Sequence, residues 1–200
     1  DKGEKPGLWV EIQTNQGQWR LEDRYPPEGM TTLALDLGGA LMNVAGTTSI
    51  LPNGATGPVY ETEPLEENIW IAGLPRLHID VTTATVGGQI YALLEDCNEN
   101  GSCIHIGHAI MDLRYHEGGT DEQTWLPIIE TINAKMEFFS LDAQVPAGHT
   151  IKLSLASTGE DYLPASTSSV VTIQEGAGSN LLLDLIDPSE KILFDPPKCT

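Results

Sequence analysis

The sequence predicts an all-β fold, a β-sandwich of the jelly-roll type, and two observations carry this prediction. The first is a hydrophobic period of two. In the segment 150–156, Ile151, Leu153 and Leu155 alternate with polar residues, which is typical of a strand with one buried face. The second is dense punctuation by Gly, Asn and Pro between short apolar segments, as in many sandwiches and jelly rolls. No long window shows the apolar stripe of an amphipathic helix.

Several short segments share this alternation or a strand-like composition between turn signals. In 76–82, for example, Leu77, Ile79 and Val81 alternate with polar residues. The expected strands are 8–13, 18–22, 32–37, 76–82, 89–95, 104–115, 134–138, 150–156, 168–174 and 181–185. The region 42–68 is rich in Pro and Gly and poor in alternation, so we expect a long ordered loop there.

The chain length fits one substantial core. Its 200 residues suffice for a single β domain, and no linker-like stretch divides the chain in two. Residues 1–7 read as a linker-like tail, so we expect one β-sandwich domain over 8–200. No signal peptide opens the sequence, and no apolar stretch approaches the length that spans a bilayer.

The net charge of the chain limits the classes of partner that it can bind. Ten basic against 29 acidic residues give a net charge of −19. Nucleic acids and anionic membrane surfaces are therefore poor candidates, because both are recognised through clustered Lys and Arg. A solvated, mutually repelling surface is the simplest consequence of this charge.

The cysteines suggest one crosslink. Cys97 and Cys103 flank a segment that contains Asn100-Gly101, a strong signal for a hairpin turn. Cysteines facing each other across a hairpin lie within disulfide distance, and a disulfide favours an extracellular or periplasmic location. Two buried thiols are the alternative, and Cys199 is left unpaired.

No catalytic motif is present in the sequence. It contains no G-x-S-x-G, G-x-G-x-x-G, G-x-x-x-x-G-K-[ST] or H-E-x-x-H pattern, so we expect no catalytic residues and no required cofactor. His105 and His108 lie three apart in an expected strand, which places them on opposite faces. They are then ordinary surface or half-buried histidines.

One local pattern resembles part of a calcium loop. Asp96, Asn98 and Asn100 alternate and are followed by Gly101, as in the first half of a loop whose oxygens wrap Ca²⁺. The twelfth position, where such a loop carries a bidentate Glu, is Gly107. Structural calcium at these three side chains and a plain polar hairpin turn both remain open.

Four tryptophans raise a carbohydrate-binding option, because jelly rolls often stack aromatic rings on sugars. Core and edge packing is the alternative, since the four do not cluster in sequence. They are Trp9, Trp19, Trp70 and Trp125.

Five blocks, in matching order, resemble the C-terminal jelly-roll domain of the X-prolyl dipeptidyl-peptidase and cocaine esterase family of serine hydrolases. Together they cover roughly residues 8–186. The blocks are Gly17-Gln18-Trp19-Arg20 with Tyr25-Pro26-Pro27; 32–35 with Gly39-Ala40-Leu41; Pro64-Leu65 with 71–77; 90–95 with Asn100-Gly101 and 112–115; and 145–149 with 151–157. Residues 158–169 and the pair Cys97 and Cys103 depart from the family pattern.

The resemblance implies a galactose-binding-like jelly roll without catalytic residues. Family members carry their Ser, Asp and His in a preceding α/β-hydrolase domain, so none of these maps onto this sequence. The domain is then expected to support that partner and to share in oligomer contacts. The alternatives are a stand-alone carbohydrate-binding module, with or without calcium, and a purely structural or cell-surface β domain.

Overall fold

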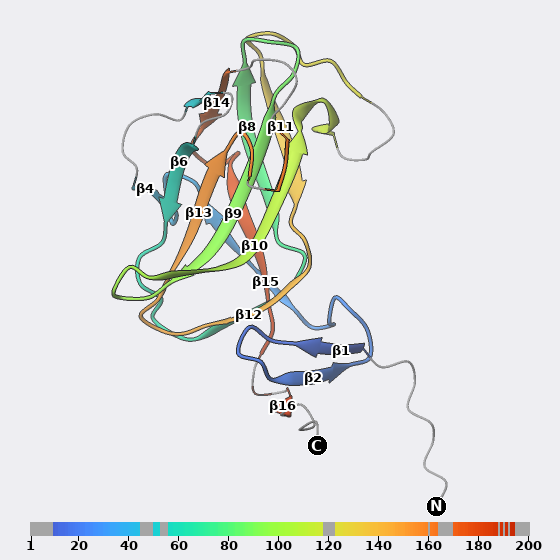
Figure 1. Ribbon diagram of the computed structural model, residues 1–200, viewed down its shortest axis with the longest axis vertical. Helices are drawn as coiled ribbons and strands as arrows, with labels where there is room; N and C mark the ends of the chain where they lie inside the picture. The colour runs from blue at the N-terminus through green and yellow to red at the C-terminus, as the bar shows by residue number, and fades with distance from the viewer. Residues whose placement is uncertain are drawn as a thin grey trace, which may run out of the picture.

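The structure is a computed structural model that describes residues 10–44, 50–52, 56–117, 123–159, 161–163, 170–187, 189, 191 and 193–194. Within these residues the secondary structure consists of strands and one 3₁₀ turn, η1 (Leu113–Tyr115). Two sheets lie face to face, and a small third sheet lies at one end of them, lower in Figure 1. The predicted all-β sandwich is confirmed.

The first sheet has five antiparallel strands. In spatial order they are β10 (Cys103–Asp112), β9 (Gln89–Cys97), β13 (Thr150–Ala156), β6 (Thr56–Glu61) and β4 (Met42–Asn43). The second sheet has eight strands, six of them in the order β12 (Leu141–Val145), β7 (Ile69–Gly73), β15 (Asn180–Leu185), β8 (Arg76–Thr83), β14 (Val170–Gln174) and β5 (Ile50–Pro52). The other two are β11 (Thr131–Glu137), paired with β8, and β3 (Thr31–Asp36), paired with β15.

The hydrophobic core fills the space between these two sheets. In β8 and β13 every second side chain is buried, which places Ile79 and Leu153 in one cluster at 0% exposure. The intervening side chains face outward. The alternation read from the sequence therefore reports which face of each strand is buried.

The third sheet consists of β1 (Val10–Gln13), β2 (Trp19–Glu22) and β16 (Leu193–Phe194). In β1 the apolar Ile12 is buried and its neighbours Glu11 and Gln13 are exposed. In β2 the polar side faces the sandwich instead: Arg20 and Glu22 are buried, whereas Leu21 between them is 42% exposed. This is the reverse of the usual orientation of an amphipathic strand.

Each expected strand overlaps a described strand, although the strand expected over 104–115 ends at Asp112 and continues as η1. The expectation of a loop over 42–68 is wrong. That region contains β4, β5 and β6, and β6 pairs with β13. Gly57 and Pro58 masked the pattern. The β6–β13 register is irregular opposite them, between Ser154 and Ala156, and such irregularities accommodate Pro and Gly in a strand.

Part of the predicted organisation lies outside the described residues. This applies to the tail 1–7 and to Cys199. The extent of a single domain over 8–200 stays a prediction. Among the helices that the structure describes, none is long and apolar enough to cross a bilayer.

Candidate functional site

A buried ionic cluster joins the third sheet to the sandwich. Arg20 projects from β2 and is fully buried. Its Nη2 lies 2.5 Å from Asp142 Oδ2 on β12, and its Nε lies 3.1 Å from Glu22 Oε1. The guanidinium also lies 5.0 Å from the ring centroid of Trp70 on β7, within the range of a cation–π contact.

Burial dominates the electrostatics of this cluster. It raises the pKa of Asp142 to about 6, while the Trp70 hydrogen bond and the Arg20 charge lower it and the charge of Glu22 raises it further. Trp70 Nε1 donates to Asp142 Oδ1 at 2.8 Å. Lys191 Nζ lies 2.9 Å from Glu22 Oε1. Two cations and two carboxylates thus lie together in this junction. Removing any one of them would leave a buried charge without its partner.

Further hydrogen bonds fasten the same junction. Asn15, in the β1–β2 turn, donates from its side-chain amide to the Gln144 carbonyl and accepts from the Gln144 N–H at 2.9 Å. Tyr25 donates its hydroxyl to the Leu141 carbonyl at 2.6 Å and accepts from the Gly73 N–H at 2.8 Å. The third sheet is therefore attached through both side chains and main chain, and it holds the start of the described chain rigidly against the sandwich.

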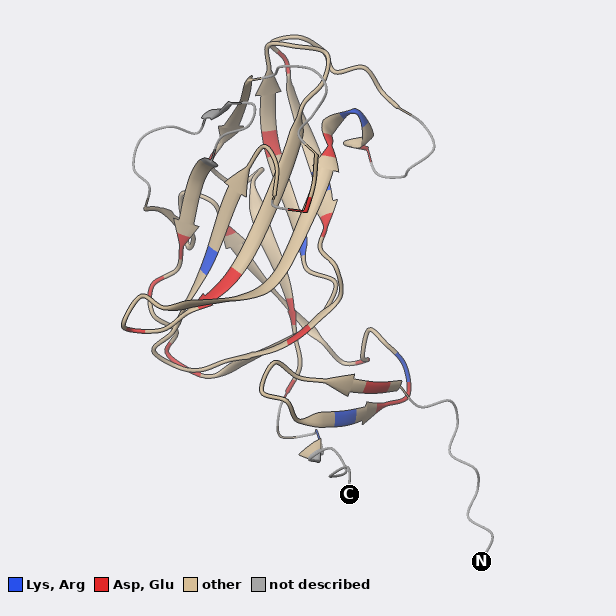
Figure 2. Cartoon of the chain, viewed as in Figure 1, with Lys and Arg blue, Asp and Glu red and all other residues tan. Residues whose placement is uncertain are grey.

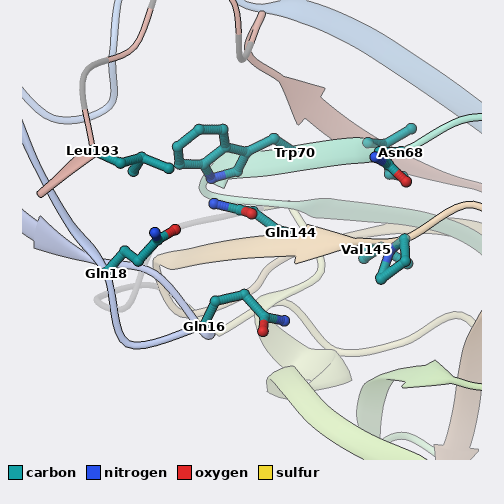
Figure 3. A pocket seen from close by; sticks show the side chains of 9 residues that line it. Gln16, Gln18, Asn68, Trp70, Gln144, Val145 and Leu193 are labelled. Carbon is teal, nitrogen blue, oxygen red and sulfur yellow. The ribbon is translucent and has the colours of Figure 1, made fainter. Parts of the chain in front are cut away.

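A pocket of about 650 Å³ opens beside this junction. Figure 3 shows hairpin residues Gln16 and Gln18 facing sandwich residues that include Gln144 and Trp70. Asn68 supplies a fourth carboxamide. The buried Nε2 of Gln144 has no hydrogen-bond partner among the described atoms. Neutral amides of this kind suit a neutral polar ligand.

A second cavity, of about 550 Å³, lies on the outer face of the five-stranded sheet. Tyr91 from β9, His105 and His108 from β10, and Asp161 from the loop after β13 line it. The His108 ring lies 5.0 Å from the ring of Phe139, centroid to centroid. A polar and aromatic cavity thus forms on a face that the core does not use.

The two cavity histidines correct a prediction. His105 and His108 share one face, with His105 Nε2 and His108 Nδ1 only 3.2 Å apart, whereas a regular strand places them on opposite faces. A register shift between His105 and Gly107 marks a β-bulge, which adds one residue and restores the side-chain phase. A Cβ at position 107 would lie 2.7 Å from Leu141 Cδ2, so the Leu141 side chain would have to shift to accept any other residue.

The predicted calcium positions have partners within the fold. Asp96 is buried, and its Oδ1 lies 2.6 Å from His149 Nδ1. Asn98 Oδ1 accepts from the N–H groups of Asn100 and Ser102, both at 3.0 Å. This is the geometry of a polar hairpin turn, and a cation would have to displace these bonds. Calcium binding stays a prediction.

The cysteines and tryptophans are placed more simply. Cys97 and Cys103 face each other at the end of β9 and β10 and form the predicted disulfide. Trp70 is buried, whereas Trp125 is 68% exposed. Trp19 is half-buried, and Trp9 lies outside the described residues. In the part of the chain that is described, no group of three His, Cys, Asp or Glu is arranged to hold a metal ion.

The β8–β9 connection and the stretch that leads into β11 lie at the end of the sandwich opposite the third sheet, uppermost in Figure 1, and both carry exposed apolar side chains. We call this surface the apolar loop end, and it consists of Val86, Trp125, Ile128, Ile129 and Leu163, between 41% and 88% exposed. The Ile129 N–H donates to the Thr83 carbonyl at 2.9 Å, and Gln89 Nε2 donates to the Leu163 carbonyl at 3.2 Å. These bonds bring three separate connections together.

Two properties distinguish the apolar loop end from the rest of the surface. In a chain with 29 acidic residues, the stretches 83–88 and 123–129 carry no charge, whereas acidic residues follow the loops at the other end of the sandwich (Figure 2). Ile129 also has a φ of 66°, which is strained for a β-branched residue. Acidic residues adjoin these stretches, among them the exposed Glu130 and Asp161. A strained and exposed apolar surface of this kind is typical of a contact region.

The two facing sheets and the third sheet joined to them define an all-β domain. The sequence model of the X-Pro dipeptidyl-peptidase C-terminal non-catalytic domain matches residues 3–179. The chain belongs to this family, and the domain is non-catalytic.

Solved structures show the same fold. A CocE/NonD family hydrolase from Staphylococcus aureus superposes with a TM-score of 0.72 at 9% identity, covering 93% of this chain and 43% of that one. An aminopeptidase from a marine sediment Thaumarchaeota archaeon gives 0.67 at 13% identity, covering 94% and 41%. An α-amino acid ester hydrolase gives 0.57 at 14% identity, covering 88% and 36%.

The matched structures are much longer than this chain, which spans less than half of their length. A comparison with curated proteins gives no match.

Proposed function

We propose that this domain is the accessory part of a larger serine hydrolase and that it packs against the α/β-hydrolase domain of the same parent chain. The observation that carries the proposal is the family match over residues 3–179. The similar hydrolases are more than twice as long as the region they share with this chain. A catalytic domain therefore has room in the parent, and the non-catalytic sandwich supplies a rigid surface for it.

The apolar loop end is the surface that we assign to this contact. Its exposed side chains, Trp125 at 68% and Ile129 at 78% among them, are costly to leave in water. Aromatic side chains at the centre of an interface often contribute most of its energy. The hydrolase domain would cover them, while the ionic junction at the opposite end holds the third sheet in place.

Placing charges at this surface should separate docking from folding. We expect Trp125→Asp with Ile129→Asp to lower the melting temperature of the intact parent enzyme by several degrees, because hot-spot contacts are worth about 2 kcal/mol or more. The same pair in the isolated 200-residue chain should change its stability little, because both side chains are exposed there. Differential scanning calorimetry of both proteins measures this.

The control is Leu21→Asp, an exposed apolar position at the other end of the molecule, which should leave the parent unchanged. Equal effects of the charged pair in parent and isolated chain would contradict the assignment. Light scattering provides a second check. A dimer of the isolated chain that dissociates in the Trp125→Asp variant would assign the surface to homo-oligomer contacts instead. Hydrolysis of an X-Pro or ester chromogenic substrate by the isolated chain would overturn the accessory role itself.

A second proposal concerns carbohydrate binding, and the junction pocket supports it. Four carboxamides line the pocket, and the Nε2 group of Gln144 lacks an acceptor, which a sugar hydroxyl can supply. We expect a glycan array probed with the full 200-residue chain to return a sugar whose binding falls at least tenfold in Gln144→Ala. The control is Gln174→Ala on β14, near the opposite edge of the eight-stranded sheet from β12. This variant should bind the sugar as the unmodified chain does. An array without a reproducible hit would dispose of this proposal.

A further inference from the structure

The histidine pair on the outer face of the five-stranded sheet has the spacing of a metal-binding site. His105 Nε2 and His108 Nδ1 lie 3.2 Å apart. Two nitrogens bound to one tetrahedral zinc ion, each at about 2.0–2.1 Å, are separated by about 3.3 Å. The two rings therefore already present their nitrogens at the separation that one ion requires.

The backbone holds this spacing. β10 pairs with β9 on both sides of the bulge, with His105 opposite Glu95 and His108 opposite Leu93. Glu95 and Leu93 are two residues apart and both lie on the outer face of β9. Because each histidine is paired with one of them, both histidines project from the same face of the sheet. A metal site on a paired strand loses little conformational entropy when the ion binds, in contrast to a site on a free loop.

The surroundings of His108 match those of a metal ligand. Its second nitrogen, Nε2, lies 3.1 Å from the Tyr162 hydroxyl. Histidines that bind a metal usually donate their other ring N–H to an oxygen, which fixes the tautomer. Burial and the neighbouring His105 lower the pKa of His108, although Asp161 raises it. A lowered pKa favours the neutral imidazole, which is the form that binds a metal.

We propose that His105 and His108 form a binding site for a divalent transition-metal ion of the zinc class. Imidazole nitrogens favour Zn²⁺, Ni²⁺ and Cu²⁺ over the hard ion Ca²⁺. The pair supplies two nitrogens, and water completes the coordination, because no third His, Cys, Asp or Glu joins them among the described residues. Asp161 lines the same cavity, and the net charge of −19 favours cation entry.

Binding requires a change of tautomer but no net transfer of protons from neutral rings. Without metal, one proton lies between Nε2 of His105 and Nδ1 of His108. With metal, the proton of His105 sits on Nδ1 and that of His108 on Nε2, where it is donated to the Tyr162 hydroxyl. Protons compete with the ion for imidazole nitrogens, so the affinity for the metal falls as the pH is lowered.

Isothermal titration of the full 200-residue chain with ZnCl₂ at pH 7.5 tests the proposal. We expect one site per chain, a higher melting temperature in the presence of the ion, and at least tenfold weaker binding in both His105→Ala and His108→Ala. The control, His78→Ala on β8 of the opposite sheet, should bind as the unmodified chain does. CaCl₂ should give no heat at the histidine pair. Calcium binding lost in Asn98→Ala would instead support the predicted calcium loop.

Imidazole nitrogen shifts in NMR spectra provide a readout independent of stability. Zinc should move His105 Nε2 and His108 Nδ1 together and leave His78 unchanged. Absence of zinc binding at millimolar concentrations, or unchanged affinity in His105→Ala, would overturn the proposal and leave the pair as a simple hydrogen bond. Neither result affects the accessory role, because the histidine pair lies outside the apolar loop end.

Discussion

Replacing Arg20 by Met should lower the free energy of unfolding by about 3–5 kcal/mol, because it leaves buried carboxylates without their cation. Arg20 is the fully buried member of the junction, paired with Glu22 and Asp142 and stacked on Trp70. Met keeps most of the side-chain volume, so the loss reports the ion pairs of Arg20 more than its packing. Urea unfolding followed by tryptophan fluorescence measures it.

A matched control separates burial from ion pairing itself. Arg24 pairs with Glu28 at 3.0 Å, but both side chains are more than half exposed. Arg24→Met should therefore cost less than about 1 kcal/mol. Arg20→Met combined with Asp142→Leu should recover part of the loss, because an apolar replacement of a whole buried pair is often neutral. If the Arg20→Met variant is as stable as the unmodified 200-residue chain, the junction does not hold the third sheet.

The second large effect is a pH dependence centred on Asp142. Its pKa is raised from 3.8 to about 6 in the folded chain, so the folded state binds a proton more tightly than the unfolded state. The stabilisation from this group is complete below pH 4 and is lost as the pH rises through 6. The difference of about two pKa units corresponds to about 3 kcal/mol.

Comparison with Asp142→Asn isolates this contribution, since the amide does not titrate. Between pH 4 and pH 8 the free energy of unfolding of the unmodified chain should fall by about 3 kcal/mol relative to that of the variant. Urea unfolding at each pH measures the difference, and the carboxyl ¹³C shift of Asp142 should titrate near pH 6. A carboxyl that remains ionised at pH 4 would mean that Arg20 outweighs burial.

Arg20 and Asp142 serve the same structural role, which is to hold the third sheet against the sandwich. In the junction, ion pairs among Arg20, Glu22, Asp142 and Lys191 replace contacts with water. Such buried ion pairs add little net free energy of folding, but they favour one orientation of the third sheet on the sandwich. The third sheet, which lies close to the start of the described chain, is thereby fixed relative to the sandwich. A domain that precedes it in a parent chain would inherit this fixed orientation.

Several structural features could be predicted from sequence because they depend on neighbours along the chain. Alternation in 76–82 and 150–156 predicts β8 and β13, since a strand exposes every second side chain. The Asn100-Gly101 turn brings Cys97 and Cys103 together, because a tight hairpin closes locally. The strand β6 was missed because Gly57 and Pro58 interrupt its pattern.

The histidine pair could be predicted only in part from the sequence. Gly107 within an apolar strand is a signal of a bulge, and with that bulge His105 and His108 return to one face. In a regular strand without the bulge, the two histidines would lie on opposite faces. Gly107 lies next to Leu141 in the fold, a residue distant in sequence.

The sequence alone determined the acidic character and predicted the all-β class, since these follow from composition and from alternation along each strand. It offered the local disulfide as one of two alternatives, because a tight hairpin brings the two cysteines together. Only the tertiary structure decided that Arg20 points inward and Leu21 outward. Hydrophobicity alone favours the opposite orientation, and the partners that reverse it, Trp70 and Asp142, come from strands far along the chain. The apolar loop end likewise exists only because folding brings three connections to one end of the sandwich.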